Sequence, residues 1–514
     1  MATLIYHAVI FLLLITLTLA QLRIPITRKS HAPDPALNRR LSTRDSVSAS
    51  LANDATQASY VISVQVGTPP QDIDLTIDTG SADTWVVLNT AASCTGVGIP
   101  DNNGSAPVLC KNPYNLNSSS TVELNITTDK FNIAYVDGGI ARGPYIADTF
   151  VLGNVTIESL QIGLANDTNI QMGILGLGYS VGEASNTVYP NIIDELVSQN
   201  LIGARVYSLY LDSQDSATGS LLFGAVDTTK FVGELVSIDI VPQPLWNGSI
   251  LYSALSVELA AVGITDQEGN TANLTTSPQV VLLDSGTSLT ILPAEVTNAI
   301  SKKLDAYDDT NFTGNVYLPC SLLNTSSSLT VDYSFSSSST SAMIRVPISE
   351  LVFPLTNPVY ALYPEDTLPD LPFSGEACAF GIQTSNDVHI LGDTFLRSAY
   401  VVYDLDNNQI GLAQANFKSN HVDASSSDGA GHEYIVELKV GESIPALTGV
   451  SVTSSAEPSP SSSASKTSNS PAATATATAT RKSGDAILMM GNVDSRVLGF
   501  FVLGGMFLNG AIVA

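Results

Sequence analysis

Short runs of apolar residues with strand-like patterns dominate the chain between about residues 55 and 417. Residues 60–66 form one such run and end at a turn rich in Gly and Pro, which is typical of a β-strand. Helical periodicity is rare: one predicted helix covers about residues 191–200, and a second begins after Pro293 and extends to about residue 304. The pattern therefore predicts a mostly β fold with few and short helices.

Two sequence elements occur twice in this body, in the same order. IDTGS at residues 77–81 is echoed by LDSGT at residues 283–287, and ILG at residues 174–176 is echoed at residues 390–392. The Asp-to-Ile spacing is 96 residues in the first half (78 to 174) and 106 in the second (284 to 390). A period this long is not that of a solenoid, so the body is interpreted as a duplicated lobe.

Each repeat delivers an aspartate to the end of a predicted strand. Asp78 follows an alternating stretch and Asp284 follows a continuous apolar run. A glycine two residues later allows the chain to turn, and a hydroxyl three residues later can hydrogen-bond the carboxylate; these residues are Gly80, Ser81, Gly286 and Thr287. If the two turns meet across a pseudo-two-fold axis, the carboxylates cannot both ionise easily and would share one proton. The ionised member could then act as general base on a water while the protonated member donates to a substrate carbonyl.

With these motifs the chain resembles the pepsin-like aspartic proteases over about residues 58–417. The matching segments are DTGS at 78–81 with Trp85 four residues beyond, DSGTS at 284–288, the two ILG segments and the stretch from Ile390 to Asp404. The resemblance implies a mostly β, bilobal fold in which two pseudo-two-fold-related lobes enclose an active-site cleft. It also implies that Asp78 and Asp284 form the catalytic dyad of an endopeptidase that cleaves polypeptides at acid pH, with no cofactor and no metal.

The resemblance further implies a hairpin flap that closes over the substrate and carries a tyrosine. Residues 131–139, which include Asp137, match this hairpin at the cleft. Tyr135 is expected to be the flap tyrosine, with its hydroxyl in reach of the Trp85 indole N–H; the alternative is an ordinary half-exposed strand aromatic. Val136 stands where the family usually has Gly, so the flap's hydrogen bonds to substrate are expected to differ.

The beginning of the chain predicts a secreted precursor. Residues 8–20 are apolar, too short to span a bilayer comfortably, and end in small residues, so a signal peptide is favoured over an anchor helix. The first 44 residues carry six basic side chains and one acid, whereas the rest carry 15 basic and 47 acidic ones. We therefore predict a zymogen whose basic propeptide restrains the acidic body, with Arg39-Arg40 or Arg44 as the processing site.

The overall charge excludes one class of partner. The chain has 21 Lys and Arg against 48 Asp and Glu, a net charge of −27. Because phosphate binding needs a basic face, nucleic acid is excluded as a partner. Only five His occur and no HExxH or CxxC spacing is present, so a zinc site has little to build on. We expect a monomer.

The C-terminal part predicts attachment to a membrane. Residues 451–480 are almost all Ser, Thr, Ala and Pro, which is typical of an O-glycosylated stalk. A small-residue site, a spacer and the uncharged tail 497–514 resemble a GPI-attachment signal with Ser483 or Gly484 as the attachment residue; a C-terminal membrane helix is the alternative. This layout narrows the resemblance to the fungal yapsin-like proteases, anchored through a GPI lipid at the plasma membrane or cell wall. The predicted order is a signal peptide (1–20), a basic propeptide (21–44), an N-terminal lobe (45–240), a C-terminal lobe (241–418), a Ser/Thr-rich stalk (419–482) and a GPI-attachment signal (483–514).

Cysteines and glycosylation sequons fit the same compartment. Four cysteines allow three connectivities, and the sequence gaps favour Cys94–Cys110 and Cys320–Cys378. Some of the nine Asn-x-Ser/Thr sequons are expected to be unused; they stand at Asn103, Asn117, Asn125, Asn154, Asn166, Asn247, Asn273, Asn311 and Asn324.

Two other functions compete with this interpretation. GYSVG at residues 178–182 satisfies the G-x-S-x-G motif of α/β-hydrolases, but it falls inside the repeated ILG segment and lacks an oxyanion-hole glycine motif upstream. A non-catalytic protein that uses the same fold for binding or adhesion would be marked by loss of one aspartate, and both are present. An aspartic endopeptidase remains the favoured prediction.

Overall fold

The computed structural model describes most of the chain between its two ends. The described ranges are 22–29 (backbone only), 59–95, 110–136, 138–153, 155–216, 218–245, 248–275, 277–310, 315–325, 328–336, 340–355, 370–418 and 435–450. The chain divides into two compact units, one made of Met1–Ser451 with Val502–Ala514 and the other of Val452–Phe501. Every described residue belongs to the first unit.

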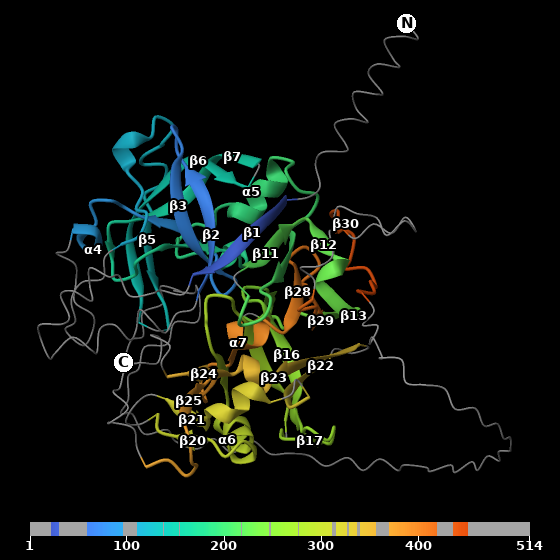
Figure 1. Cartoon of the computed structure of the whole chain (residues 1–514). Coiled ribbons are helices and arrows are strands. Elements are labelled where there is room, and N and C mark those ends of the chain that lie inside the picture. Colours follow the sequence, from blue (N-terminus) through green and yellow to red (C-terminus); the bar gives the residue numbers. More distant parts are fainter. Residues whose placement is uncertain are drawn as a thin grey trace, which may run out of the picture. The chain divides into compact units, whose positions relative to one another are not determined.

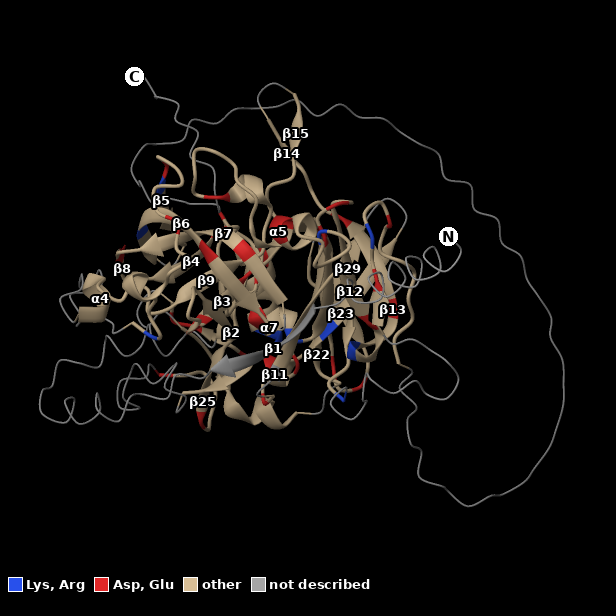
Figure 2. Ribbon diagram, turned by 90° about the horizontal axis from the view of Figure 1, so that it is seen from above, with Lys and Arg blue, Asp and Glu red and all other residues tan. Residues whose placement is uncertain are grey.

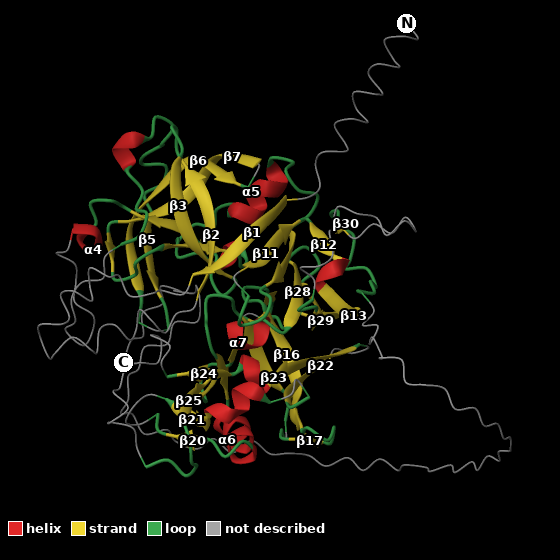
Figure 3. Cartoon of the chain, viewed as in Figure 1, coloured by secondary structure: helices red, strands yellow, loops and turns green. Residues whose placement is uncertain are grey.

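The described residues are mostly β, which confirms the predicted fold class (Figures 1 and 3). One large sheet of 14 strands runs through this unit. Its strands are, in spatial order, β13 (Phe231–Asp239), β29 (Gln409–Ala415), β28 (Ala399–Asp404), β10 (Val206–Tyr210), β11 (Thr218–Phe223), β1 (Leu22–Lys29), β2 (Ser59–Val66), β3 (Gln71–Asp78), β9 (Gly173–Gly176), β4 (Thr84–Val87), β7 (Val155–Ala165), β6 (Ile140–Leu152) and β5 (Lys130–Ala134), with β8 (Asp167–Thr168) beside β6.

The remaining strands form smaller sheets, and the helices are short. An eight-stranded sheet contains β23 (Ser341–Pro347), β22 (Thr330–Ser336), β16 (Ser256–Thr265), β18 (Gln279–Leu283), β27 (Ile390–Leu391), β19 (Thr290–Leu292) and β26 (Ile382–Thr384), with β17 (Thr271–Asn273) beside β16. A four-stranded sheet contains β20 (Tyr307–Asp308), β21 (Val316–Pro319), β25 (Ala377–Phe380) and β24 (Val352–Pro354), and two pairs are β12 (Ala225–Asp227) with β30 (Ile435–Glu437) and β14 (Gln243–Pro244) with β15 (Ile250–Leu251). The helices are α4 (Ala92–Thr95), α5 (Ile192–Ser198), α6 (Ala294–Lys303) and α7 (Asp393–Leu396), with 3₁₀ turns η1 (Leu116–Ser118), η2 (Ser180–Gly182), η3 (Thr228–Lys230), η4 (Cys320–Asn324) and η5 (Ile348–Glu350).

The two predicted helices form where the sequence signals place them. Asn191 caps α5: its side chain accepts hydrogen bonds from two backbone N–H groups of the first turn, while the Asp194 carboxylate accepts one from the Asn191 N–H. This reciprocal capping box satisfies donors that a helix start otherwise leaves unpaired. Ile192, Ile193 and Leu196 face the core, so capping and apolar spacing together determine this helix. α6 follows Pro293 directly, as its proline predicts.

The duplicated motifs occupy equivalent places in the two halves. In the first half, β3 pairs in parallel with β9, so that Asp78 lies opposite Gly176. In the second half, β18 pairs in parallel with β27, with Leu283 opposite Leu391. A third strand in each half, β4 or β19, runs antiparallel to the ILG strand. Each half therefore sets its Asp turn beside its ILG segment, in agreement with a two-lobed fold.

Strand pairing also joins the two halves. β10 from the first half pairs antiparallel with β28 from the end of the second, and β13 pairs antiparallel with β29. The large sheet therefore contains strands from both sides of the expected lobe boundary at residues 240 and 241. A cut at this position does not separate two independent sheets.

The folded body extends beyond its expected end at residue 418. In residues 435–450, which we call the C-terminal strap, β30 pairs antiparallel with β12. Leu438 and Ile444 of the strap are 2% and 8% exposed and belong to an apolar cluster with Phe231 of β13. A stalk that starts directly after residue 418 is therefore wrong, because these apolar side chains complete part of the core.

The strap is expected to contribute measurably to stability. Leu438→Ala should lower the free energy of unfolding by about 2–4 kcal/mol, because it removes buried methyl groups and leaves a cavity. Val440→Ala is the matched control in the same strap, since Val440 is 67% exposed and surface changes stay within about 0.5 kcal/mol. Urea unfolding of both variants measures the difference; equal midpoints would contradict the packing of the strap.

Several predicted segments lie outside the described residues. These are the signal peptide, the stalk from residue 451 on and the GPI-attachment signal. Within the described ranges, none of the helices combines the length and the hydropathy needed to cross a bilayer. Residues 22–29 of the predicted propeptide are described as a backbone strand, β1, which pairs antiparallel with β11 and β2 in the large sheet.

Candidate active site

Asp78 ends strand β3 and Asp284 directly follows strand β18. Apolar side chains of both strands are buried in the same hydrophobic core, which fixes the position of the two aspartates. Their exposed fractions are 4% and 7%. Each carboxylate accepts a hydrogen bond from the N–H two residues later and another from the hydroxyl three residues later. The donors are Gly80 N (2.8 Å) and Ser81 Oγ for Asp78, and Gly286 N (2.8 Å) and Thr287 Oγ1 (2.6 Å) for Asp284.

The glycines of both turns bring the two carboxyl groups together. A Cβ atom on Gly80 would lie 2.7 Å from a carboxylate oxygen of Asp284, and one on Gly286 would lie 2.6 Å from Oδ1 of Asp78. Each carboxyl group therefore packs over the glycine of the other turn, where any side chain would collide with it.

A second pair of residues ties the two turns to each other beneath the carboxyl groups. Thr79 Oγ1 donates to the Leu283 carbonyl (2.8 Å) and accepts from the Ser285 N–H (2.9 Å). In the mirrored arrangement, Ser285 Oγ donates to the Ile77 carbonyl (3.0 Å) and accepts from the Thr79 N–H (3.2 Å). Both hydroxyls are buried, so these bonds fix the spacing of the two aspartates. The sequence motif contains both residues, but only the two-fold geometry gives them this task.

The glycine of each ILG segment packs closely against the backbone beside an Asp turn. A Cβ on Gly176 would lie 2.6 Å from backbone atoms of Ala82 and Asp83, just after the first Asp turn. A Cβ on Gly392 would lie 2.2 Å from the Thr287 carbonyl oxygen in the second turn. Only glycine lets these strands pass so close to the turns, which explains why both ILG segments recur with the Asp turns.

The electrostatics of the pair favour a shared proton. Burial, and next the charge of Asp284, raise the pKa of Asp78 to about 8, while hydrogen bonds from Ser81 and Gly80 act in the opposite direction. Two close carboxyls in a dry site do not both ionise easily. One carboxylate and one carboxylic acid therefore stand next to each other, which provides a base and an acid at one point.

Tyr135 lies over this pair, at the end of β5. Trp85 Nε1 donates a hydrogen bond to the Tyr135 hydroxyl (2.9 Å), as the flap interpretation expects. Burial, and next the charge of Asp78, hold the pKa of Tyr135 well above its usual range. Tyr135 therefore stays a neutral donor and acceptor. Asp137 lies outside the described residues.

Asp83 is a buried residue that the sequence reasoning does not single out. Its carboxylate accepts hydrogen bonds from Tyr145 (2.7 Å), Tyr189 (2.8 Å) and one backbone N–H. The rings of Tyr189, Tyr145, Phe131 and Trp85 follow one another with centroid distances of 5.4, 5.6 and 5.9 Å. Asp83 thus fixes the hydroxyl ends of two of these four aromatic residues, one of which, Tyr145, packs against Phe131 of the hairpin. An acid directly before the buried strand β4 is the one signal that could have revealed it.

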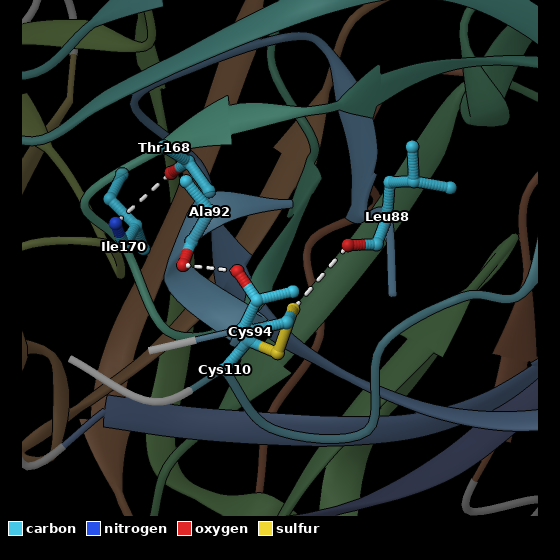
Figure 4. Close-up of a disulfide and its surroundings, with 7 residues drawn as sticks. Leu88, Ala92, Cys94, Cys110, Thr168 and Ile170 are labelled. Atoms are coloured by element: carbon cyan, nitrogen blue, oxygen red, sulfur yellow. Dashed lines mark hydrogen bonds between the residues drawn. A yellow bond between two sulfur atoms is a disulfide. The ribbon is translucent and has the colours of Figure 1, made fainter. Parts of the chain in front are cut away.

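Both predicted disulfides are present, and the sequon asparagines that the structure describes are exposed. Disulfides join Cys94 to Cys110 and Cys320 to Cys378, as the sequence gaps favour (Figure 4 shows the first). All described sequon asparagines are exposed, and they are Asn117, Asn125, Asn166, Asn273 and Asn324. The other sequon asparagines, Asn103, Asn154, Asn247 and Asn311, lie outside the described residues, as do Ser483 and Gly484.

The G-x-S-x-G motif does not form a nucleophile elbow. Ser180 begins the short 3₁₀ turn η2, and the chain leaves this turn in an extended conformation at Glu183 instead of entering a helix. The elbow requires a helix directly after the serine, so the serine-hydrolase alternative loses its support. Among the described residues, no three or more His, Cys, Asp and Glu side chains are grouped so that they could hold a metal ion.

Comparison with known proteins gives a consistent set of relatives. The family model "Eukaryotic aspartyl protease" matches residues 59–415. The chain is 35% identical over 451 residues to the "Probable aspartic-type endopeptidase opsB" of Aspergillus fumigatus, covering 85% of this chain and 84% of that protein. It is 32% identical over 386 residues to "Candidapepsin-3" of Candida albicans, covering 75% of this chain and 86% of that protein. An aspartic proteinase from Irpex lacteus has a similar fold, with a TM-score of 0.53, 22% identity, and coverage of 77% of this chain and 98% of that one.

Proposed function

The chain belongs to the eukaryotic aspartyl protease family and is an aspartic-type endopeptidase, and from this premise we propose that Asp78 and Asp284 are its catalytic dyad. The observation that carries the proposal is the mirrored geometry of the two turns. Each carboxyl receives the same pair of hydrogen bonds, and each lies over the glycine of the opposite turn. No other pair of carboxyl groups among the described residues is part of a duplicated motif.

The geometry supports hydrolysis by a water held between the two carboxyl groups. The ionised carboxyl takes a proton from the water, whose oxygen attacks the peptide carbonyl carbon, while the protonated carboxyl donates its proton to the carbonyl oxygen. The resulting tetrahedral diol collapses when the carboxyl that took the water proton passes it to the amide nitrogen and the C–N bond breaks, while the other carboxyl, now ionised, takes a proton from a diol hydroxyl as the product acid forms. One carboxyl ends ionised and the other protonated, so the dyad is regenerated. The task belongs to the pair and not to either residue alone.

Hydrogen bonds around the dyad prepare it for this task. The two glycine N–H groups donate to one oxygen of each carboxyl, and the Ser81 and Thr287 hydroxyls donate to the other. Such fixed donors stabilise the ionised state without reorganisation during the reaction. Tyr135, held by Trp85, would close over the substrate as the flap and exclude water from the site.

The test of this function is cleavage of a peptide library at acid pH, with and without a pepstatin-type inhibitor. We expect internal peptide bonds to be cleaved, and the inhibitor to stop cleavage when it is present in slight excess over the enzyme. A serine-directed fluorophosphonate serves as the control and should have no effect. Cleavage that resists pepstatin would overturn the dyad assignment.

We further infer that the protein is made as a secreted zymogen. Secreted relatives such as the "Secreted aspartic protease 3" of Candida albicans support entry into the secretory pathway. Acidic positions outnumber basic ones along the ribbon of the described body (Figure 2). The arginines of residues 21–44 would pair with carboxyl groups of this body until these take up protons. Cleavage after Arg39-Arg40 would then release an enzyme that is active in acid.

Surface attachment through a GPI lipid at Ser483 or Gly484 is the remaining part of the proposal. Its support is the order of Ser/Thr-rich stalk, small residues and uncharged tail at 497–514. Phosphatidylinositol-specific phospholipase C should release the protein from intact cells, and its C-terminal peptide should end at residue 483 or 484 by mass spectrometry. Recovery of peptides from residues 497–514 in the mature surface protein would leave a membrane helix instead.

A further inference from the structure

The flap hairpin is held by the contact between Tyr135 and Trp85 and also by the short strand β8 along one edge. The β6 strand pairs with β5 inside the hairpin and with the short strand β8 on its other edge, where Ala141 lies opposite Thr168 and Arg142 opposite Asp167. Figure 2 shows β5, β6 and β8 next to one another. The turn of the hairpin ends at Ile140, the first residue of β6, so β8 meets the hairpin directly below its tip.

Two side chains from this edge reach the backbone of the flap tip. The Ile140 N–H donates to Asn169 Oδ1 (2.7 Å), and Asn169 Nδ2 donates to the Gly138 carbonyl (3.2 Å). Thr168 Oγ1 donates to the Ile140 carbonyl (2.6 Å). Thr168 is 2% exposed, so its hydroxyl is committed to this contact and not to water.

The described residues of the tip also form hydrogen bonds with one another. Within the turn, the Tyr135 N–H donates to the Gly139 carbonyl (2.8 Å) and the Gly138 N–H donates to the Tyr135 carbonyl (3.0 Å). These bonds shape the turn but do not position it over the dyad. Val136 at the tip is 60% exposed. The Tyr135–Trp85 contact and the bonds from Thr168 and Asn169 connect the described part of the tip to the body of the protein.

The segment that carries these two side chains is itself braced by a disulfide. Thr168 Oγ1 accepts a hydrogen bond from the Ile170 N–H (3.0 Å), and both residues lie beside the Cys94–Cys110 disulfide (Figure 4). Residue 111, directly after Cys110, donates its N–H to the carbonyl of residue 171 (2.8 Å). Ile170 and both cysteines also pack against the apolar cluster that contains the base of the hairpin. The two segments that the disulfide joins therefore pack beside the edge from which the flap tip is held.

We propose that Thr168 and Asn169 form a clamp, braced by the Cys94–Cys110 disulfide, that holds the flap in its substrate-binding position. Both are positioning residues, because they act through the backbone of the flap and not on the substrate. The inference rests on the proposed role of the hairpin at residues 131–139 as the flap. Without the clamp, substrate would have to order the flap tip on binding, which lowers apparent affinity in proportion to the loss of the competent conformation.

The expected signature is a rise in KM with little change in kcat. Loss of one or two ordinary hydrogen bonds corresponds to about a 5- to 10-fold effect. Once the substrate is bound, the closed flap has the same contacts with Trp85 as before, so the chemical step should change less than about twofold. A role limited to general stability would instead lower the active fraction of enzyme and leave KM unchanged.

The chain offers matched variants for this test. Asn169→Leu removes both amide bonds but keeps the size of the side chain and the sequon at residues 166–168. Thr168→Val removes the hydroxyl and the sequon together, whereas Thr168→Ser keeps both. Asn166→Gln removes only the sequon, since the exposed Asn166 side chain takes no part in the clamp. Each protein is titrated with pepstatin to count active sites before kcat and KM are measured, and the exchange rate of the Ile140 amide is measured on the same samples.

We expect a 5- to 10-fold higher KM and faster Ile140 amide exchange in Asn169→Leu and Thr168→Val, with Thr168→Ser and Asn166→Gln close to wild type. If Asn169→Leu does not fold, Thr168→Val against Asn166→Gln still gives the answer. A KM within twofold of wild type in both clamp variants would overturn the proposal, as would a loss of kcat at unchanged KM. Wild-type protein without pepstatin-sensitive cleavage would overturn the proposed function instead, and amide exchange would still decide whether the clamp exists.

Discussion

Asp78→Asn is expected to lower kcat by at least about 10³-fold while the protein remains folded, and Asp284→Asn should do the same. Gly80 N–H and Ser81 Oγ now donate to separate oxygens of Asp78; the asparagine amide oxygen keeps the bond from Gly80, and its NH2 group can donate to the rotatable Ser81 hydroxyl instead. The amide cannot take up a proton, however, so the pair loses its alternation between base and acid. Hydrolysis of a peptide substrate at acid pH, with near-ultraviolet circular dichroism as the folding check, measures both parts of this expectation.

A third buried aspartate provides the matched control. Asp332 is 2% exposed and accepts hydrogen bonds from the Thr265 and Thr330 hydroxyls, much as the dyad residues accept bonds from theirs. Asp332→Asn should therefore cause a similar structural disturbance with activity retained. Substantial cleavage by either dyad variant would end the aspartic mechanism, and equal loss in the Asp332 variant would mean that the assay reports folding only.

The dyad and its glycines were accessible to sequence reasoning because local chemistry determines them. A strand that ends in Asp, followed by a small turn residue and a hydroxyl, is recognisable in one dimension, and its repetition supplies the second half of the site. The strands before Asp78 and Asp284 and the helices after Asn191 and Pro293 follow from apolar spacing and capping in the same way. Short-range physics is sufficient for these elements.

The supporting residues were not accessible, because their roles depend on contacts far apart in the sequence. Thr79 meets Ser285 across 206 residues, and Asp83 meets Tyr189 across 106. Asn169 is a polar loop residue without a motif, and only the pairing of β6 with β8 reveals its contact with the flap. The sequence prediction places the C-terminal strap in the stalk for the same reason. Its apolar residues are few, and only the structure shows that they are buried against Phe231.

One consequence of the fold is that burial raises the pKa of carboxyl groups in its interior. Burial raises the pKa of Glu183 to about 9, and burial also raises the pKa of Asp83. Glu183 is 6% exposed, and among the described residues its Oε1 atom has no hydrogen-bond partner. Its Oε2 atom accepts from the Tyr189 N–H (2.9 Å). Glu183 therefore needs its proton in the folded state but not in the unfolded state.

The free energy of unfolding is accordingly expected to fall as the pH rises. A carboxyl with a raised folded pKa stabilises the protein fully below its unfolded pKa, and this contribution is lost as the pH rises through the folded pKa. For Glu183 that window runs from its ordinary pKa of 4.5 to about 9. Within it, the slope is about 1.4 kcal/mol per pH unit for each carboxyl that is protonated only in the folded state. An acid-adapted stability profile thus accompanies the acid-dependent dyad.

Glu183→Gln isolates this effect, because the amide keeps an acceptor for Tyr189 but cannot ionise. Urea unfolding between pH 5 and 8 is measured on an Asp284→Asn background, which prevents self-digestion. We expect the slope of unfolding free energy against pH to be smaller by about 1.4 kcal/mol per unit in the glutamine variant. The exposed Glu158→Gln exchange in the same half of the chain is the control and should leave the slope unchanged. Parallel pH profiles with and without Glu183 would show that this glutamate is ionised in the folded protein, and the loss of stability would then have to come from the dyad or from Asp83.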